Sequence, residues 1–199
     1  MTDDAVECQL GTQDKILDDD QMLVSAARQD TEAAGRLYDR YYSEILGYIY
    51  HCTYDCTIAE DLTSNVFLAA FRHLGRYQWK QLSFRAWLFR VATNEVRMHW
   101  RRKKRLKIVS LQVDDEEHSP EPSAGARMAA AEEYRLLHKA LMELQVKYRT
   151  VIILRYFEGK AITEICEITG KKEGTVKAQL HRGLARLKDI LVRWGMLTE

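Results

Sequence analysis

A basic surface on one predicted helix is the most informative chemical feature of this 199-residue sequence. Apolar residues recur at helical spacing between residues 173 and 191, at Val176, Leu180, Leu184, Leu187 and Leu191, which predicts an amphipathic helix. The opposite face carries small and cationic side chains, namely Lys177, Ala178, His181 and Arg182. Such a face can lie in a DNA major groove, where Arg donates to guanine and a small side chain meets a thymine methyl group.

A shorter helix and a polar turn precede this helix. Isoleucines at 162, 165 and 168 recur at helical intervals and stop at Gly170, a residue suited to a left-handed helix end. The turn that follows contains Lys171, Lys172, Glu173 and Gly174. Thr175 is the expected N-cap of the next helix, which would leave amide groups for a phosphate. The pattern predicts a DNA-binding helix-turn-helix. The alternative is an ordinary amphipathic helix with a solvated basic face, a common feature of globular domains.

A second nucleic-acid signal lies in the middle of the chain. Residues 76–83 lack helical periodicity and contain two aromatic residues that we expect to be exposed, Tyr77 and Trp79. The helix predicted at 84–105 ends in the adjacent cations Arg101, Arg102, Lys103, Lys104 and Arg105, which repel one another unless an anion is near. Aromatic faces stack on unpaired bases, with about 1–3 kcal/mol per base, while cations hold the backbone. The stretch is therefore a candidate single-strand binder, although core packing is the better interpretation of Trp87.

Residues 59–74 predict another amphipathic helix. Apolar residues form one side, and polar residues gather at its start, among them Asp61, Thr63 and Asn65. From periodicity alone, this is a capped helix packed on a core.

Charge is distributed unevenly, although the net charge is only +1. Residues 1–20 contain seven acidic side chains, whereas residues 97–107 contain seven bases and no acid, which indicates a surface that binds a polyanion. No apolar run is long enough to span a membrane, and the acidic start does not resemble a signal peptide. We therefore expect a soluble cytoplasmic protein without membrane insertion.

Catalytic and metal-binding motifs are not evident in the sequence. It has no G-x-S-x-G, no H-E-x-x-H and no phosphate-binding glycine loop, so a hydrolytic enzyme has little support. Cys52 and Cys56 would share a helix face beside His51, but a zinc site needs four ligands and no second pair is evident. We expect no metal, no cofactor and no enzymatic activity.

The periodicity predicts an all-α fold with two small helical domains joined by a flexible linker. The linker is expected at residues 107–127, which contain acidic residues at 114–117 together with Pro120 and Pro122. The domains are expected at 21–106 and 128–193, with a flexible acidic lead at 1–20 and a tail at 194–199.

Three motifs in this order, AEDLT-x-x-VF, FRAWL and EGTVK, make the sequence similar to the sigma-70 family, and most closely to its extracytoplasmic-function (ECF) group. The resemblance covers residues 21–106 as region 2 and residues 128–193 as region 4. It implies a subunit that binds core RNA polymerase and directs promoter recognition, promoter melting and transcription initiation. It also implies promoter DNA and an anti-sigma factor as partners.

The resemblance assigns residues to three surfaces. Core polymerase would be bound by Asp61, Thr63, Asn65 and Phe67. The minus-ten element would be bound by Tyr77, Trp79, Asn94, Met98, Arg101 and Arg102. The minus-thirty-five element would be bound by Lys171, Lys172, Thr175, Lys177, Ala178, His181 and Arg182. Departures from the family pattern include Met98 at a position that is polar in some members, and Gln78-Trp79-Lys80 in place of the usual loop.

The alternative function is a transcriptional regulator that binds duplex DNA through the helix-turn-helix alone, without being a polymerase subunit. That alternative leaves the stretches at 59–74 and 77–105 unexplained.

Overall fold

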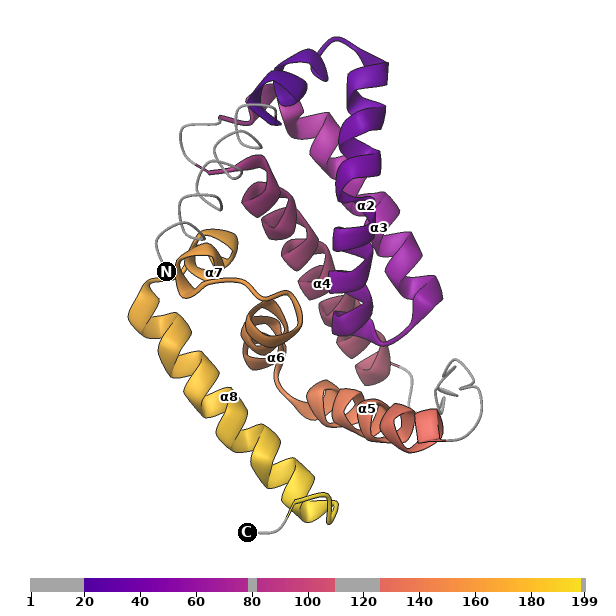
Figure 1. Cartoon of the computed structure of the whole chain (residues 1–199), viewed down its shortest axis with the longest axis vertical. Helices are drawn as coiled ribbons and strands as arrows, with labels where there is room; N and C mark the ends of the chain where they lie inside the picture. The colour runs from indigo at the N-terminus through magenta and orange to yellow at the C-terminus, as the bar shows by residue number, and fades with distance from the viewer. Residues whose placement is uncertain (1–19, 79–81, 110–125, 198–199) are drawn as a thin grey trace, which may run out of the picture.

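The computed structural model describes residues 20–78, 82–109 and 126–197, and within these ranges it contains helices and no strand. The expectation of an all-α fold is therefore confirmed. A short helical segment at residues 20–26 is followed by the helices of a first module: α2 (Thr31–Thr53), α3 (Cys56–His73) and α4 (Phe84–Val109). A second module contains α5 (Ala126–Glu143), α6 (Val146–Ile152), the π-helical segment η3 (Ile153–Phe157), α7 (Ile162–Thr169) and α8 (Glu173–Arg193). Figure 1 shows the two modules one above the other.

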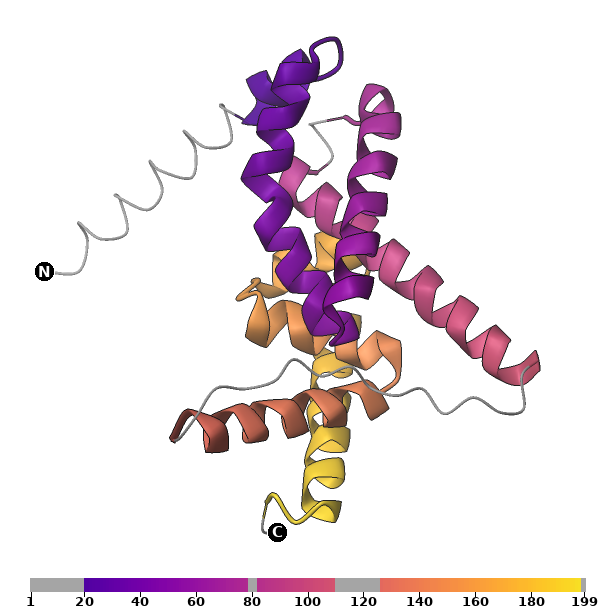
Figure 2. The same cartoon turned by 90° about the vertical axis from the view of Figure 1, so that its right-hand side faces the viewer.

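Local capping sets the ends of the first helices. The Asp30 side chain accepts a hydrogen bond from the Glu32 amide (2.9 Å) at the start of α2, and Asp55 accepts one from the Ile58 amide (2.9 Å) at the start of α3. Tyr54 ends α2 in the left-handed conformation, with φ of 55°. These caps supply partners for amides that have none inside the helix, and they turn the chain so that α2 and α3 lie side by side (Figure 2).

The core of the first module is rich in aromatic side chains. The rings of Tyr41 and Phe84 lie 5.5 Å apart, and those of Tyr48 and Phe89 lie 5.3 Å apart. The buried hydroxyl of Tyr48 is hydrogen-bonded to the Thr93 hydroxyl at 2.9 Å, which satisfies both polar groups. These contacts join α2 to α4 through the centre of the module.

Asp20 corrects the expected extent of the acidic lead at 1–20. Its side chain is buried, accepts a hydrogen bond from the Tyr41 hydroxyl and pairs with Arg40 at 2.6 Å. A buried carboxylate needs such partners, so Asp20 belongs to the folded module. Residues 1–19 lie outside the described ranges.

The second module is built on close contact between α6 and α8. The buried face of α8 consists of Val176, Leu180, Gly183, Leu187 and Ile190. A Cβ atom on Gly183 would lie 3.0 Å from Ile152 Cδ1 and 3.2 Å from Tyr148 Cβ, so the glycine permits the close packing. Leu184, which the sequence placed in the apolar stripe, is not part of this buried face and is 38% exposed, so the prediction was wrong at this position.

Polar contacts fasten the two modules to each other. The Lys160 ammonium, buried between η3 and α7, lies 2.7 Å from a carboxylate oxygen of Glu44 on α2, and Arg85 on α4 pairs with the same carboxylate. Burial raises the pKa of Glu44, but the hydrogen bonds from Arg85 and Lys160 outweigh it and lower the pKa overall. Arg90 donates to the Glu167 carbonyl oxygen of α7 at 2.5 Å. The charged groups therefore hold α7 against α2 and α4.

An aromatic cluster around His138 forms a further part of this contact. His138, on α5, is fully buried, with its ring 4.5 Å from Tyr54 and 5.4 Å from His51 of the first module. Tyr134 and Phe157 of the second module complete the cluster at 4.6 and 5.4 Å. Neither ring nitrogen of His138 has a hydrogen-bond partner within the described residues, so the neutral ring is strongly favoured.

The expected linker lies mostly outside the described ranges. Helix α4 continues to Val109 and α5 begins at Ala126, so both helices extend into the region that we expected to be linker.

None of the described helices combines the length and the apolar character needed to cross a bilayer.

Candidate nucleic-acid interface

The helix-turn-helix is formed as the spacing predicts. Gly170 ends α7 in the left-handed region with φ of 67°, and its amide donates to the Cys166 carbonyl oxygen at 2.8 Å. At the other end, the Glu164 carboxylate accepts from the Ala161 amide at 2.7 Å, which satisfies one terminal donor although Ala161 has no polar side chain. Ile165 and Ile168 of α7 are buried with Val176 of α8. The two helices are thus held at a fixed angle by a shared apolar core.

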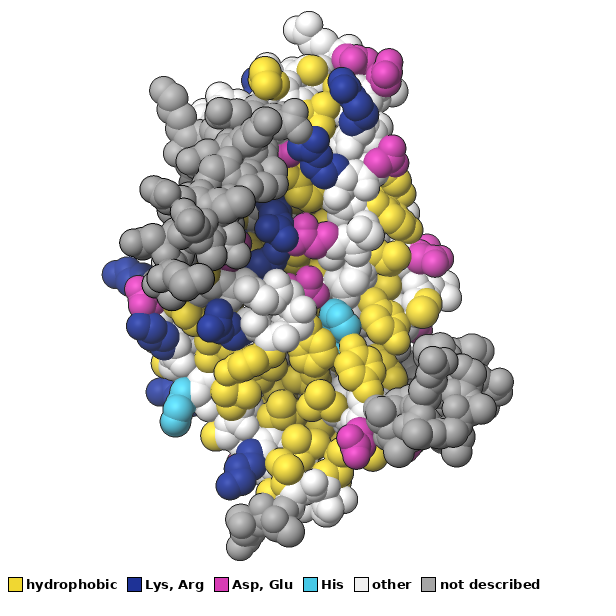
Figure 3. Space-filling view, viewed as in Figure 1, with side chains coloured by type: hydrophobic (Ala, Val, Ile, Leu, Met, Phe, Trp, Pro, Cys, Tyr) yellow, Lys and Arg dark blue, Asp and Glu magenta, His cyan; other side chains and the backbone are white. Residues whose placement is uncertain are grey.

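The predicted reading face of α8 is exposed. Lys177, Ala178, His181 and Arg182 all lie on the surface, on the side of the helix opposite Val176, Leu180 and Gly183. Lys177 pairs with Glu173 one turn earlier at 2.6 Å, which raises the Lys177 pKa through that hydrogen bond. Basic side chains and a histidine line the edge formed by α8 in Figure 3. The four side chains are therefore placed together and free of the core.

Thr175 does not cap α8, contrary to the sequence prediction. The helix begins at Glu173, with Lys172 at the cap position and no side-chain cap, so Thr175 is exposed within the first turn. Lys172 is exposed as well, whereas Lys171 is half-buried and donates to the Gln179 side-chain oxygen at 2.7 Å. The turn therefore presents cations together with the uncapped start of a helix, a combination that attracts anions.

The predicted minus-ten residues of α4 lie on its surface. Asn94, Met98, Arg101 and Arg102 are exposed, and their spacing places them along one side of the helix. Their neighbours Thr93 and Val96 are buried. The helix thus separates a core face from a face with one amide, one thioether and two guanidinium groups.

Tyr77 is not an exposed aromatic residue, which corrects the prediction. It is 5% exposed, and its ring lies 4.9 Å from Trp87 and 5.8 Å from Phe84. Its hydroxyl donates to the Leu82 carbonyl oxygen at 2.5 Å, and its own carbonyl oxygen accepts from Arg28 at 2.8 Å. Tyr77 therefore belongs to the core of the first module, where it is hydrogen-bonded to Leu82 and Arg28. Trp79 lies outside the described ranges.

Helix α3 divides the four predicted polymerase contacts into two pairs. Asp61 and Asn65 are exposed, but Thr63 and Phe67 are buried, with 0% and 3% exposure. The Thr63 hydroxyl donates to the Ala59 carbonyl oxygen at 2.7 Å, and the Phe67 ring lies 4.7 Å from Tyr38. The prediction did not include Leu68, a large apolar side chain that is 55% exposed. Its position three residues after Asn65 and seven after Asp61 was the signal in the sequence, because this spacing gives one helical face.

Cys52 and Cys56 differ in their exposure to solvent. Cys52 is buried, and burial raises its pKa to about 12, whereas Cys56 is exposed at the start of α3. Within the described ranges, no group of three or more His, Cys, Asp or Glu side chains is placed to hold a metal ion.

Comparison with known proteins gives matches over both modules. Residues 37–106 match the family model described as Sigma-70 region 2, and residues 134–187 match that described as Sigma-70, region 4. The chain is 31% identical over 171 residues to the ECF RNA polymerase sigma factor SigL of Mycobacterium tuberculosis, with 86% of this chain and 96% of SigL covered.

Two further similarities extend this result. The chain is 31% identical over 175 residues to the ECF RNA polymerase sigma factor BldN of Streptomyces coelicolor, covering 86% of this chain and 65% of BldN. The fold resembles the sigma factor RpoE from Bartonella quintana, solved in complex with the anti-sigma factor NepR. That likeness has a TM-score of 0.64 at 22% identity and covers 79% of this chain and 95% of the RpoE chain.

Proposed function

Since the chain belongs to the ECF group of RNA polymerase sigma factors, which direct promoter-specific transcription initiation, we propose that three exposed surfaces divide this work among them. The protein is then a non-catalytic subunit that acts in the cytoplasm together with core RNA polymerase. The observation that carries the proposal is that α8 buries one apolar face and exposes basic side chains on the other, while α4 buries residues up to Val96 and exposes the cations Arg101 and Arg102 beyond it.

Helix α8 contacts the minus-thirty-five element in this proposal. Arg182 reaches a guanine edge with its guanidinium fork, while Ala178 lies close to a thymine methyl group. His181 and Lys177 flank them, and Lys177 exchanges its partner Glu173 for a phosphate. Lys171, Lys172 and Thr175, at the uncapped start of the helix, hold the phosphate backbone.

Helix α4 contacts the minus-ten element. Asn94 and Met98 meet the unpaired bases, and Arg101 and Arg102 hold the backbone of the single strand. Trp79, which precedes α4 in the sequence, is the aromatic residue that we propose for base stacking. Tyr77 does not itself contact DNA, because its ring is already packed on Trp87 and Phe84.

Helix α3 contacts core RNA polymerase through its exposed side. Asp61, Asn65 and Leu68 form this side, with Leu68 as the apolar anchor, since a large exposed apolar side chain within a polar rim is typical of a binding surface. Phe67 supports the contact indirectly, by packing the helix on Tyr38 of α2, and Thr63 is buried within α3.

An anti-sigma factor is a further proposed partner, as the complex of RpoE with NepR suggests. Hydrophobic side chains gather on the lower module in Figure 3, and the second module exposes Tyr134, Tyr156 and Leu184. These exposed apolar side chains are the ones that such a partner would cover.

The experiment for the polymerase surface is a titration of purified core RNA polymerase with fluorescently labelled protein. Leu68→Asp is expected to weaken binding at least tenfold, because it places a charge at the centre of the contact. The matched control is Leu197→Asp, which changes a leucine of similar exposure (46%) in the tail and should bind within twofold of the wild type. Wild-type affinity of the folded Leu68→Asp variant would contradict the assignment.

A further inference from the structure

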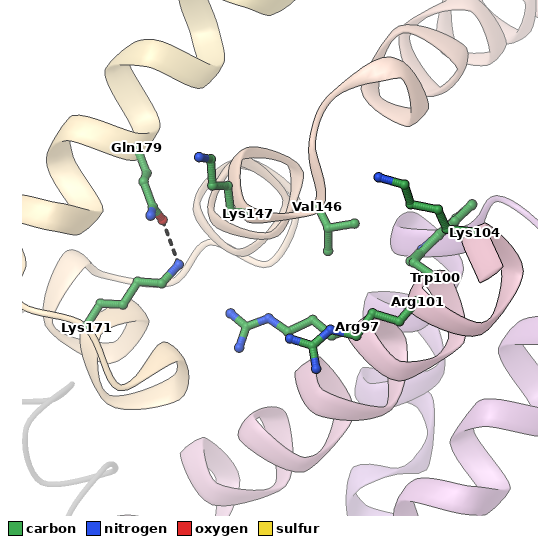
Figure 4. A pocket seen from close by; sticks show the side chains of 8 residues that line it. All are labelled: Arg97, Trp100, Arg101, Lys104, Val146, Lys147, Lys171 and Gln179. Atoms are coloured by element: carbon green, nitrogen blue, oxygen red, sulfur yellow. Dashed lines mark hydrogen bonds between the residues drawn. The ribbon is translucent and has the colours of Figure 1, made fainter. Parts of the chain in front are cut away.

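We propose that a cleft between the two modules binds a small anion that carries several phosphate groups. The cleft has a volume of about 490 Å³. Its lining comes from α4 on one side and from α6, the helix-turn-helix turn and α8 on the other: Arg97, Trp100, Arg101, Lys104, Val146, Lys147, Lys171 and Gln179 (Figure 4). Such binding goes beyond sigma-factor activity and requires that the two modules be packed together.

The charges that line this cleft are of one sign. Five of the lining residues are cations, namely Arg97, Arg101, Lys104, Lys147 and Lys171, and none of the described carboxylates lines the cleft. Within the described ranges, none of the five forms an ion pair with Asp or Glu. Burial, and then repulsion from Arg97 and Lys147, lower the pKa of Lys171. The packed arrangement thus concentrates positive charge at a free-energy cost that a bound anion would relieve.

The geometry of the cations suits phosphate. Arg97 and Arg101 extend from α4 toward the space that Lys171 borders from the other side, while the ammonium groups of Lys104 and Lys147 lie at the rim and point away from the guanidinium groups (Figure 4). The hydrogen bond from Lys171 to Gln179, 2.7 Å long, holds that ammonium at the edge of the cleft. Guanidinium groups bind two phosphate oxygens at once, and ammonium groups act as point charges for further oxygens. Cations from several directions therefore match a chain of phosphates better than a single one.

The size of the cleft favours a small ligand over a nucleic-acid duplex. Pockets for small molecules have volumes of about 300–1,000 Å³, and this cleft lies within that range. Because its two walls belong to different modules, a ligand that contacts both walls binds only while the modules are packed together. By linkage, such a ligand stabilises the packed arrangement over any state in which the modules separate.

The test is isothermal titration calorimetry of the full chain with inorganic tripolyphosphate, in the absence of polymerase and DNA. We expect saturable binding of one ligand per chain. The double variant Lys104→Gln/Lys147→Gln removes one cation from each wall and should weaken the affinity more than fivefold. The matched control is Lys188→Gln, which removes an exposed lysine of α8 that does not line the cleft, and it should bind like the wild type.

The outcomes separate the sources of the phosphate chemistry. Similar affinities for tripolyphosphate and for ATP or GTP would assign recognition to the phosphate chain alone, while tighter binding of a nucleotide would add its base to the ligand. Either result supports the site. Absence of saturable binding, or a change of less than fivefold in a double variant that keeps its circular dichroism spectrum and Tm, would overturn the proposal. If the double variant does not fold, Lys147→Gln alone should weaken binding more than twofold, and a smaller change would overturn it.

Discussion

The buried ring of His138 makes the stability of the chain depend on pH in a defined direction. Burial, with a smaller contribution from His51, lowers the pKa of His138 from its ordinary value of 6.5 to about 4. Between these two values the unfolded chain binds a proton that the folded chain does not, so stability falls as the pH falls. Replacing His138 with Leu removes this proton and should remove its share of the pH dependence.

The size of the effect follows from the two pKa values. Between pH 7.5 and pH 5, protonation of His138 in the unfolded chain costs about 2 kcal/mol of unfolding free energy. His138→Leu should change stability by less than about 1 kcal/mol at pH 7.5, because it replaces two unpaired ring nitrogens with an apolar group of similar size.

Urea unfolding followed by far-ultraviolet circular dichroism, at pH 7.5 and pH 5 and equal ionic strength, measures this difference. We expect the wild type to lose about 2 kcal/mol more than His138→Leu between the two pH values. The control is His73→Asn, which changes an exposed histidine and should retain the wild-type pH dependence. An equal pH dependence in the wild type and His138→Leu would refute the reasoning.

Three further predictions concern packing, the module contact and DNA recognition. Gly183→Ala should destabilise the chain by about 1 kcal/mol in urea unfolding, because the added Cβ atom would contact Tyr148 and Ile152. The matched control Gly35→Ala adds a Cβ atom in open space and should stabilise the chain by about 0.5 kcal/mol. A stabilising effect of Gly183→Ala would contradict the packing of α6 on α8. Lys160→Met should cost about 2 kcal/mol by the same measurement, since it removes a buried charged hydrogen bond to Glu44; an unchanged midpoint would count against this contact. Arg182→Ala should weaken the preference for the cognate minus-thirty-five duplex over an unrelated duplex by about 1–3 kcal/mol, as measured by fluorescence anisotropy. The control Arg193→Ala should leave this preference unchanged. Equal losses in both variants would argue against base recognition by Arg182.

Helix positions were predictable because capping and periodicity are local properties of the chain. Gly170 ends α7 and Phe84 begins α4 as expected, and the exposed face of α8 follows from the 3.6-residue repeat. The error at Leu184 has a structural cause. The 3.6-residue repeat placed Leu184 in the apolar stripe, whereas the close approach of α6 and α8 buries Gly183 and leaves Leu184 exposed.

The burial of two predicted site residues, Tyr77 and Phe67, depends on contacts that lie outside their own helical segments. Tyr77 is buried because Trp87 and Phe84 offer it an aromatic pocket, and Phe67 is buried because Tyr38 covers it. Neither partner can be identified from spacing within one helix. The module contact was equally inaccessible, since Lys160 and Glu44 are 116 residues apart and resemble ordinary surface charges in the sequence.

Run-off transcription from a promoter library, using bacterial core RNA polymerase with and without this protein, tests the central claim most directly. The account predicts transcripts that depend on the protein and start downstream of a shared pair of upstream elements. Leu68→Asp should abolish these transcripts, and Leu197→Asp should preserve them. Absence of any protein-dependent transcript from a core enzyme shown to be active, together with tight binding of the protein alone to duplex DNA, would contradict the account.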